Sequence, residues 1–229
     1  MCGRFTLTAD SAALENVFAL EDAAIWAGPR YNIAPTQAVA VISDRQPKSL
    51  SMMRWGLVPA WAKDPKIGSR MINARSETAH EKPAFRSAFR RRRCLIPADG
   101  YYEWARQGKR KTPMYIQHAQ RDIFAFAGLW ESWQDAQGNW LDTCTILTTA
   151  ANARIQPIHH RMAVIIEPSE YALWLAPREL DPGEWQPLMA GPREQQLKYH
   201  TVSSQVNYVR NDHAALIKPA QPPTANTLL

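Results

Sequence analysis

Short segments rich in β-branched and aromatic residues constrain the fold of this 229-residue chain more than any other feature. Each is bounded by Pro, Gly or Asp, and together they span residues 39–42, 94–96, 101–104, 114–117, 123–130, 143–149 and 163–166. Runs of this length and composition predict β-strands. They are too short and too closely spaced for repeated parallel strand–helix–strand units, so the sequence predicts an α+β fold dominated by strands.

Helical spacing is confined to a few segments. Behind Asp10 and Ser11, either of which can cap a helix, apolar residues recur at helical spacing and predict a surface helix over residues 10–20. Phe85 and Phe89 indicate a second helix. Further short elements are expected at 169–175 (helix) and 199–202 (strand).

The chain shows no internal repeat and no low-complexity linker, so we expect one domain over residues 1–218. A chain of this size buries roughly 70% of its extended surface and needs neither disulfides nor a structural metal. Residues 219–229 are rich in Pro and in small or polar residues. They contain too little apolar surface to offset the entropy of ordering, and we expect them to form a disordered tail.

Two absences bear on location and redox state. No segment approaches the ~18 apolar residues of a membrane span, and no hydrophobic leader follows Met1, so we expect a cytoplasmic protein without membrane contact. The three cysteines Cys2, Cys94 and Cys144 have no paired spacing. This favours free, reduced thiols over disulfides.

Basic residues are concentrated in the first half of the chain. Residues 1–120 carry 19 basic and 10 acidic side chains, whereas residues 121–229 carry 8 and 11. Nineteen of the 27 basic residues are Arg, whose forked guanidinium suits contacts with phosphate and bases. This distribution fits a polyanionic partner, and it fits a solvated basic surface equally well.

Cys2 is the strongest chemical clue. A Met followed by a residue as small as Cys is normally removable, which would leave Cys2 with a free α-amine beside its thiol. With unperturbed pKa values of about 8 and 8.5, both groups are partly nucleophilic near neutral pH. Such a 1,2-aminothiol can condense with an aldehyde to a thiazolidine ring, or it can act in acyl transfer with its own amine as base. An ordinary small residue in a first strand is the alternative.

Two segments combine apolar and rigid residues. Residues 31–37 form the start of a loop in which Pro35 offers a rigid wedge, or an ordinary turn. Trp55 and Trp61 flank a segment that serves either as core packing or as a stacking platform for bases.

Three polar side chains alternate in the next segment. On a strand, Asn73, Arg75 and Glu77 would share one face, which either lines a cleft or simply meets solvent. Glu103 lies between aromatic neighbours. Desolvation there would raise its affinity for a proton, as general acid–base work near neutral pH requires, unless Glu103 lies on the wet face of a strand.

His159 and His160 are adjacent, and we expect at most one of them to point into a site. No spacing of His, Cys or carboxylates is typical of a zinc site, so the sequence predicts neither a metal nor a cofactor. The run of four Arg at residues 90–93 predicts a solvated helix end, or extra nucleic-acid contacts if it faces a cleft.

In their order along the chain these segments resemble one family closely, the SRAP (SOS response-associated peptidase) proteins. The shared motifs are Met-Cys-Gly-Arg at 1–4, Asn-Ile-Ala-Pro at 32–35, Trp-Gly-Leu-Val-Pro at 55–59, Ile-Asn-Ala-Arg at 72–75, Ala-Asp-Gly-Tyr-Tyr-Glu-Trp at 98–104 and Ile-His-His-Arg-Met at 158–162. The resemblance implies a single compact α+β domain with a twisted antiparallel or mixed β core flanked by helices. It also implies a sensor of abasic sites in single-stranded DNA.

By this resemblance, Cys2 captures the ring-opened aldehyde of an abasic site as a stable thiazolidine that shields the lesion. Asn73 orients the sugar and the amine, Glu103 moves protons at the cysteine, and His159 acts on the sugar oxygen. Removal of Met1 is then catalysed by the protein itself or by a methionine aminopeptidase.

The resemblance also implies where DNA binds. The matching positions are Arg4, Asn32, Pro35, Trp61, Arg75 and Arg161. The arginines contact phosphates, whereas Pro35 and Trp61 unstack and kink the strand beside the lesion. The implied partner is single-stranded DNA with abasic sites, including junctions with duplex, bound by a monomer that associates with the nucleoid.

Two positions depart from the family pattern. Ala163 stands where the family usually has Pro, which bears on the rigidity of the segment that carries His159. Ala62 stands where some members have a second Trp beside Trp61, which predicts a smaller stacking wedge.

Two other functions fit parts of the sequence. Cys2 followed by Gly also resembles the start of glutamine-dependent amidotransferases, which are N-terminal-nucleophile amidohydrolases. Those enzymes usually feed ammonia to a synthase domain that has no counterpart here, and such an enzyme would not explain the Arg and Trp residues. A passive single-strand binder would show salt-dependent DNA binding without covalent chemistry.

Overall fold

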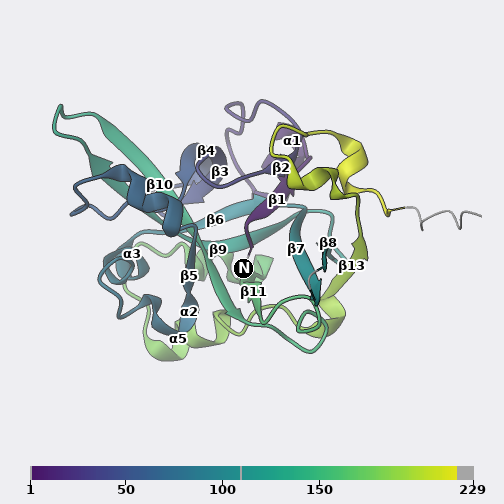
Figure 1. The fold of residues 1–229 in the computed structure, drawn as a ribbon. Helices are drawn as coiled ribbons and strands as arrows, with labels where there is room; N and C mark the ends of the chain where they lie inside the picture. The colour runs from purple at the N-terminus through teal and green to yellow at the C-terminus, as the bar shows by residue number, and fades with distance from the viewer. Residues whose placement is uncertain (1, 109, 221–229) are drawn as a thin grey trace, which may run out of the picture.

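Two β-sheets dominate the structure, a computed structural model that describes residues 2–108 and 110–220 (Figure 1). The smaller sheet has the strand order β13-β8-β7-β1-β2. Its strands are β13 (Leu197–Thr201), β8 (Arg110–His118), β7 (Gly100–Gln107), β1 (Arg4–Leu7) and β2 (Arg30–Ile33). The larger sheet has the order β11-β10-β4-β3-β6-β9-β12, with β5 paired to β10 beside this path. Its strands are β11 (Arg161–Ala163), β10 (Trp140–Ala150), β4 (Gln46–Trp55), β3 (Ala38–Ser43), β6 (Arg93–Ala98), β9 (Phe124–Gln134), β12 (Ile165–Ile166) and β5 (Asn73–Arg75).

The larger sheet closes on itself. Strand β9 pairs with β6 on one side and with β10 on the other, so that β10, β4, β3, β6 and β9 form a barrel. The β10–β4 pair is parallel and the other neighbours are antiparallel. Closure leaves no unpaired edge among these strands. The predicted α+β fold with a mixed, strand-rich core is confirmed.

Short helices flank the sheets. They are α1 (Ser11–Phe18), α2 (Ser76–Ala79), α3 (Arg86–Arg91), α4 (Tyr171–Trp174) and α5 (Pro182–Leu188). Further 3₁₀ turns lie at Pro65–Arg70, Pro168–Glu170, Glu194–Gln196, Ser204–Asn207 and Ala214–Ile217. Of the two candidate caps of α1, Asp10 is the one that caps the helix, because its carboxylate accepts a hydrogen bond from the Ala13 N–H at 2.8 Å. Within the described residues, no helix has the length and apolar character needed to span a bilayer.

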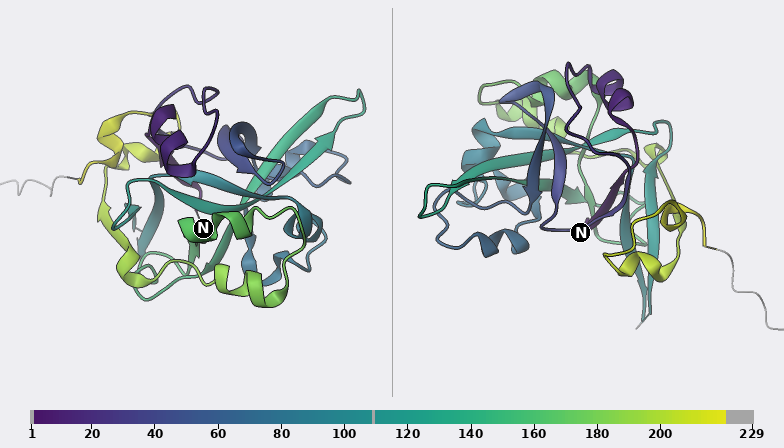
Figure 2. Two further views of the ribbon diagram at one scale, coloured as in Figure 1. Left: turned by 180° about the vertical axis from the view of Figure 1, so that it is seen from behind. Right: turned by 90° about the horizontal axis from the view of Figure 1, so that it is seen from above.

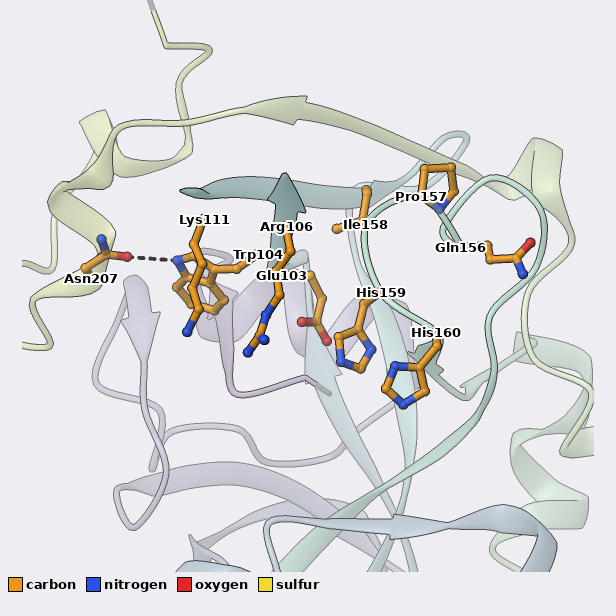
Figure 3. A pocket seen from close by; sticks show the side chains of 10 residues that line it. All are labelled: Glu103, Trp104, Arg106, Lys111, Gln156, Pro157, Ile158, His159, His160 and Asn207. Carbon is orange, nitrogen blue, oxygen red and sulfur yellow. Dashed lines mark hydrogen bonds between the residues drawn. The ribbon is translucent and has the colours of Figure 1, made fainter. Parts of the chain in front are cut away.

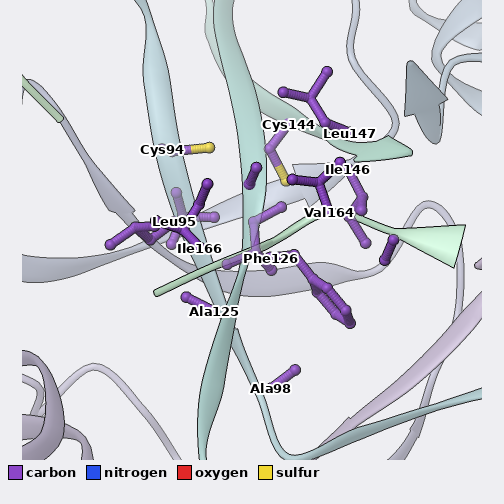
Figure 4. Packing of buried hydrophobic residues seen from close by; sticks show 14 of the residues in the cluster. Cys94, Leu95, Ala98, Ala125, Phe126, Cys144, Ile146, Leu147, Val164 and Ile166 are labelled. Atoms are coloured by element: carbon purple, nitrogen blue, oxygen red, sulfur yellow. The ribbon is translucent and has the colours of Figure 1, made fainter. Parts of the chain in front are cut away.

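The core lies in the barrel and between the two sheets. Figure 4 shows the apolar side chains that fill it. Gly128 on β9 is required there, because a Cβ at this position would lie 2.7 Å from the Cys94 Sγ. The smaller sheet packs on the barrel through Phe5 of β1. The centroid of the Phe5 ring lies 5.2 Å from that of Trp55 and 5.8 Å from that of Phe126, both in edge-to-face geometry. This packing holds β1, and the residues just before it, at the junction of the sheets.

The views in Figure 2 show two features that extend from this core. The β9–β10 hairpin projects well beyond the barrel, and the segment after β13 folds back beside β2. Val202 forms a β-bridge with Pro219, and the Ala220 N–H donates to the Thr201 carbonyl at 2.8 Å. The first two residues of the expected tail thus pair with the rest of the chain, whereas residues 221–229 lie outside the described part.

The structure departs from the sequence analysis in three places. Residues 31–33 belong to β2 rather than to a loop, because Ile33 pairs with Phe5 across β1, a contact distant in sequence. Strand β4 was not predicted, although it pairs along most of β3. Strand β5 ends at Arg75, and Glu77 lies in α2, so Glu77 does not alternate with the two polar residues before it.

Candidate active site

Cys2 lies just before β1 and is fully buried. Its backbone carbonyl accepts a hydrogen bond from the Asn73 side-chain amide at 2.8 Å, and its thiol donates to the Arg4 carbonyl at an S···O distance of 3.9 Å. Burial raises the pKa of the thiol far above its usual range, and the negative charge of Glu103 raises it further. The thiol is therefore protonated at neutral pH, and a reaction at sulfur needs a group that removes this proton.

Glu103 lies on β7, the neighbour of β1 in the smaller sheet, and is only 3% exposed. Burial raises the pKa of its carboxyl, which brings the group toward the range useful for general acid–base chemistry near neutral pH. Figure 3 shows the carboxyl group beside the His159 ring, where both side chains line one cavity. The alternative in which Glu103 lies on the solvent-exposed face of a strand is therefore ruled out.

His159 lies in the segment between β10 and β11. Its Nδ1 lies 3.0 Å from the Arg161 backbone nitrogen and 3.2 Å from the Arg161 carbonyl oxygen, so the backbone of Arg161 orients the ring. Desolvation lowers the pKa of the ring and favours its neutral form. His160 stacks on His159 with ring centroids 4.3 Å apart and lines the same cavity. The expectation that only one of the two histidines enters the site is therefore wrong.

Asn73 supplies an amide from the barrel side of the site, on β5. Its Nδ2 binds the Cys2 carbonyl, while its Oδ1 is buried and has no hydrogen-bond partner among residues 2–108 and 110–220. A buried acceptor without a partner is costly. This oxygen is therefore suited to accept a hydrogen bond from a ligand hydroxyl or amine.

Two cavities with basic and aromatic linings each include a residue that interacts with Cys2. The first has a volume of about 770 Å³ and is lined in part by Glu103, His159, Trp104, Arg106 and Lys111. The second has a volume of about 570 Å³ and is lined in part by Asn73, Trp61, Arg75, Lys82 and Phe85. The Cys2 carbonyl is hydrogen-bonded to Asn73 and its thiol is affected by the charge of Glu103, so Cys2 interacts with one residue of each lining.

Arg4 and Asn32 are coupled to each other. Arg4 Nη1 donates to the Asn32 Oδ1 and to the Val206 carbonyl, both at 2.8 Å. Asn32 is fully buried, and its amide nitrogen donates to the same Val206 carbonyl and to two further carbonyls of the segment after β13, those of Tyr208 and Asn211. Since both polar atoms of Asn32 are engaged inside the protein, this side chain orients Arg4 rather than facing solvent.

The guanidinium groups of Arg75 and Arg161 differ in how far they are open to a ligand. Arg75 is exposed at the end of β5 and lines the second cavity. Arg161 is 11% exposed, and its Nη1 and Nη2 bind the two carboxylate oxygens of Glu77 at 2.5 and 2.8 Å. The Arg161 guanidinium thus has a full set of internal partners on its forked side.

The chain also matches known proteins in sequence. Residues 1–209 match the family described as SOS response associated peptidase (SRAP). The chain belongs to the SRAP family. Among its relatives, YoqW of Bacillus subtilis (strain 168) is 44% identical and aligns over 95% of this chain and 99% of its own length. YedK of Escherichia coli (strain K12) is 31% identical, with 96% and 100% covered. HMCES of Gallus gallus is 30% identical, with 96% and 78% covered. Each of the three is named an abasic site processing protein.

Solved structures support the SRAP fold. A protein from Bacteroides thetaiotaomicron superposes with a TM-score of 0.88 at 24% identity, over 96% of this chain and 100% of the other. A protein from Bordetella bronchiseptica gives a TM-score of 0.76 at 26% identity, over 88% and 100%.

The two departures from the SRAP motifs lie in well-supported backbone. Ala163 is paired with Thr148 in the β11–β10 ladder, so pairing holds the segment after His159. The Ala62 carbonyl accepts a hydrogen bond from the Trp133 indole at 2.7 Å, which braces the loop that presents Trp61, 61% exposed. Pro35 is half-buried in the turn after β2. Trp55 belongs to the core and Trp61 to the surface, so each of the two alternatives for this segment applies to one Trp.

Several residues that line the two cavities lie outside the SRAP motifs. Arg106 and Lys111 face each other across the β7–β8 hairpin and line the first cavity. Lys82 and Phe85 line the second cavity. In the sequence, the position of Arg106 three residues after Glu103 was the available sign that it belongs to the site. Only the register of the β7–β8 hairpin shows that Lys111 lies beside Arg106.

The remaining titratable clusters do not form a metal site. Within the described ranges, no group of three or more His, Cys, Asp or Glu residues is placed to hold a metal ion. Cys94 and Cys144 are free and buried, and burial raises the pKa of both thiols. Of the Arg run, Arg93 is buried and donates to five backbone carbonyls, whereas Arg90 and Arg91 are exposed at the end of α3.

Proposed function

We propose that this SRAP protein binds single-stranded DNA and captures the ring-opened aldehyde of an abasic site with Cys2 as a thiazolidine. The observation that carries the proposal is the burial of Cys2 between the Asn73 amide and the Glu103 carboxyl, each of which lines a basic cavity. Relatives that match nearly the whole chain and are named abasic site processing proteins support it.

The proposed reaction starts at the α-amine that Cys2 gains when Met1 is removed. The amine adds to the aldehyde carbon, and loss of one water gives an imine. The Cys2 sulfur then bonds to the imine carbon while the thiol proton passes to the imine nitrogen, which closes a five-membered ring. The step needs no oxidant or reductant.

Three side chains have proposed roles in this chemistry. Glu103 accepts the thiol proton and delivers protons to the departing water, work that suits a carboxyl whose pKa is raised by burial. His159, whose ring the Arg161 backbone holds through Nδ1, donates a proton to the sugar oxygen during ring opening. The free Oδ1 of Asn73 accepts from the amine or a sugar hydroxyl. Reversal uses the same groups, because both directions share one transition state.

We assign the two cavities to the DNA strand on either side of the lesion. The residues assigned to DNA are Arg4, Asn32 through Arg4, Pro35, Trp61, Arg75 and Arg161. Arg4 and Arg75 neutralise phosphates, Arg161 lies at the strand with its charge paired to Glu77, and Trp61 and Pro35 unstack neighbouring bases. Such contacts read the backbone and shape of the strand, so sequence preference is small. The proposal includes binding as a monomer and binding at junctions with duplex.

We also assign the removal of Met1 to this site, as hydrolysis of the peptide bond before Cys2. Intact-mass measurement after cell-free synthesis without aminopeptidase tests this step. Wild-type protein should lose Met1, and retention would assign the removal to a separate enzyme.

A denaturing gel of Met1-free protein with single-stranded DNA that carries one abasic site tests the main proposal. A heat-stable shifted band should form, and it should require both Cys2 and the lesion, with Cys2→Ala and intact DNA as controls. Protein that retains Met1 should give no band, because its amine is blocked. DNA binding without any band would refute the covalent mechanism and leave a passive binder, while glutamine hydrolysis would indicate an amidohydrolase.

A further inference from the structure

We infer that Glu77 is a positioning residue, which ties Arg161 to helix α2 and so holds the Asn73 strand and the His159 segment at a set separation. The inference rests on the proposed function, since its effect is on the rate of crosslinking. Glu77 lies in helix α2, whereas the alternating polar pattern of the sequence indicated a strand face shared with Asn73 and Arg75.

The Glu77–Arg161 pair has the geometry of a strong ion pair. Both carboxylate oxygens accept from the two terminal guanidinium nitrogens, at 2.5 and 2.8 Å, in the forked arrangement typical of Arg and carboxylate. The Arg161 side chain is 11% exposed and that of Glu77 is 47% exposed. The hydrogen bond from Arg161 lowers the pKa of Glu77, so the carboxylate stays ionised at neutral pH.

The pair is tied to the barrel through one strand. Arg161 Nη2 also donates to the Thr148 carbonyl at 2.5 Å, and the Thr148 hydroxyl donates to the Ala74 carbonyl at 3.3 Å. Thr148 lies on β10, which pairs with β5 and with β11. The Glu77 contact thus links the elements on both sides of β10.

Each end of this link is close in sequence to a residue of the site. Glu77 follows Asn73 by four residues, at the β5–α2 junction, and Asn73 binds the Cys2 carbonyl. Arg161 follows His159 by two residues, and its backbone N–H holds the His159 Nδ1. A shift of Arg161 therefore moves the hydrogen bond that orients the histidine.

The same contact makes rate and affinity respond in opposite directions. Glu77 neutralises the Arg161 guanidinium and occupies its forked donors, so loss of the carboxylate frees a cation at the proposed DNA cleft. Affinity for undamaged single strands should rise, while chemistry slows because the site is less well ordered. A residue that only stabilises the fold would lower both.

Glu77→Gln tests this, with Glu81→Gln as the matched control. Glu81 lies four residues further on, its side chain is 68% exposed, and its carboxylate lies 3.3 Å from the His80 Nε2. Single-turnover crosslinking at saturating DNA should slow about tenfold to hundredfold in Glu77→Gln, the scale of a small misplacement of reacting groups. The salt slope of binding to undamaged single strands should steepen by roughly 0.7, one added phosphate contact. Glu81→Gln should change neither quantity to this extent.

The possible outcomes distinguish failure of the proposed crosslinking function from failure of the positioning role of Glu77. If wild-type protein does not crosslink, the proposed function fails. If wild type crosslinks and Glu77→Gln matches Glu81→Gln in rate and salt slope, the positioning role is wrong. A parallel fall of rate, affinity and melting temperature in Glu77→Gln would also overturn it, because this would show a purely structural residue.

Discussion

Glu103→Gln is the most informative single change, because two physical effects of the substitution oppose each other. The amide keeps the size of the side chain but cannot take up or release a proton. It also removes the negative charge that raises the pKa of the Cys2 thiol. The first effect should slow crosslinking, whereas the second should make the thiolate more available.

The magnitudes decide the sign. Even a hundredfold rise in the thiolate fraction, about the effect of one nearby charge, raises the rate only about tenfold, since nucleophilicity falls as basicity falls. Burial is the larger cause of the raised thiol pKa and persists in the variant. General acid–base catalysis contributes about 10²–10⁴-fold. The net expectation is a loss of about tenfold to a thousandfold.

The assay is single-turnover crosslinking of Met1-free protein, followed on denaturing gels between pH 5 and 9. Wild type should show a limb in its rate profile above the ordinary pKa of a Glu, and the variant should lack it. Because burial raises the pKa of Glu103 in the folded state, its ionisation lowers stability as the pH rises. The variant should therefore be at least as stable at pH 7, and slow crosslinking cannot be ascribed to unfolding. A variant that crosslinks as fast as wild type would refute the proton-transfer role.

Two further predictions concern the barrel and the first cavity. Arg93→Met removes a buried cation that donates to five carbonyls, and it should lower the free energy of unfolding by about 3–5 kcal/mol. Chemical denaturation checks this, and a loss below about 1 kcal/mol would mean that water replaces these bonds. Arg106→Ala should weaken single-strand binding and flatten its salt slope by roughly 0.7, while the crosslinking rate at saturating DNA stays unchanged. An unchanged slope would exclude the first cavity as a path for phosphates.

Local patterns in the sequence carried most of the element assignments. The β-branched runs around Val41, Ile96 and Ile146 became β3, β6 and β10, because a period of two and bulky side chains suit a pleated, buried strand. Strand β2 was missed, since four residues with a polar Asn32 look like a loop until a partner strand is present.

The candidate site divides in the same way. The identity of its chemical groups was readable, because a Cys at position 2 and a Glu among aromatic residues carry their chemistry wherever they lie. Their surroundings were not readable. The stacking of His160 on His159, the coupling of Asn32 to Arg4 and the pairing of Glu77 with Arg161 depend on backbone geometry and on segments up to 84 residues apart in sequence.

The sequence by itself determined which elements tend to form and which functional groups the chain possesses, since both depend on a residue and its near neighbours. Only the tertiary structure decided that β9 joins β10 to close a barrel, and that Cys2 is buried against Asn73 with Glu103 nearby. Burial and charge shift the pKa values of Cys2 and Glu103, and both are sums over contacts with residues remote in sequence. For that reason the fold determines how reactive the site is, although the sequence determines which chemical groups it contains.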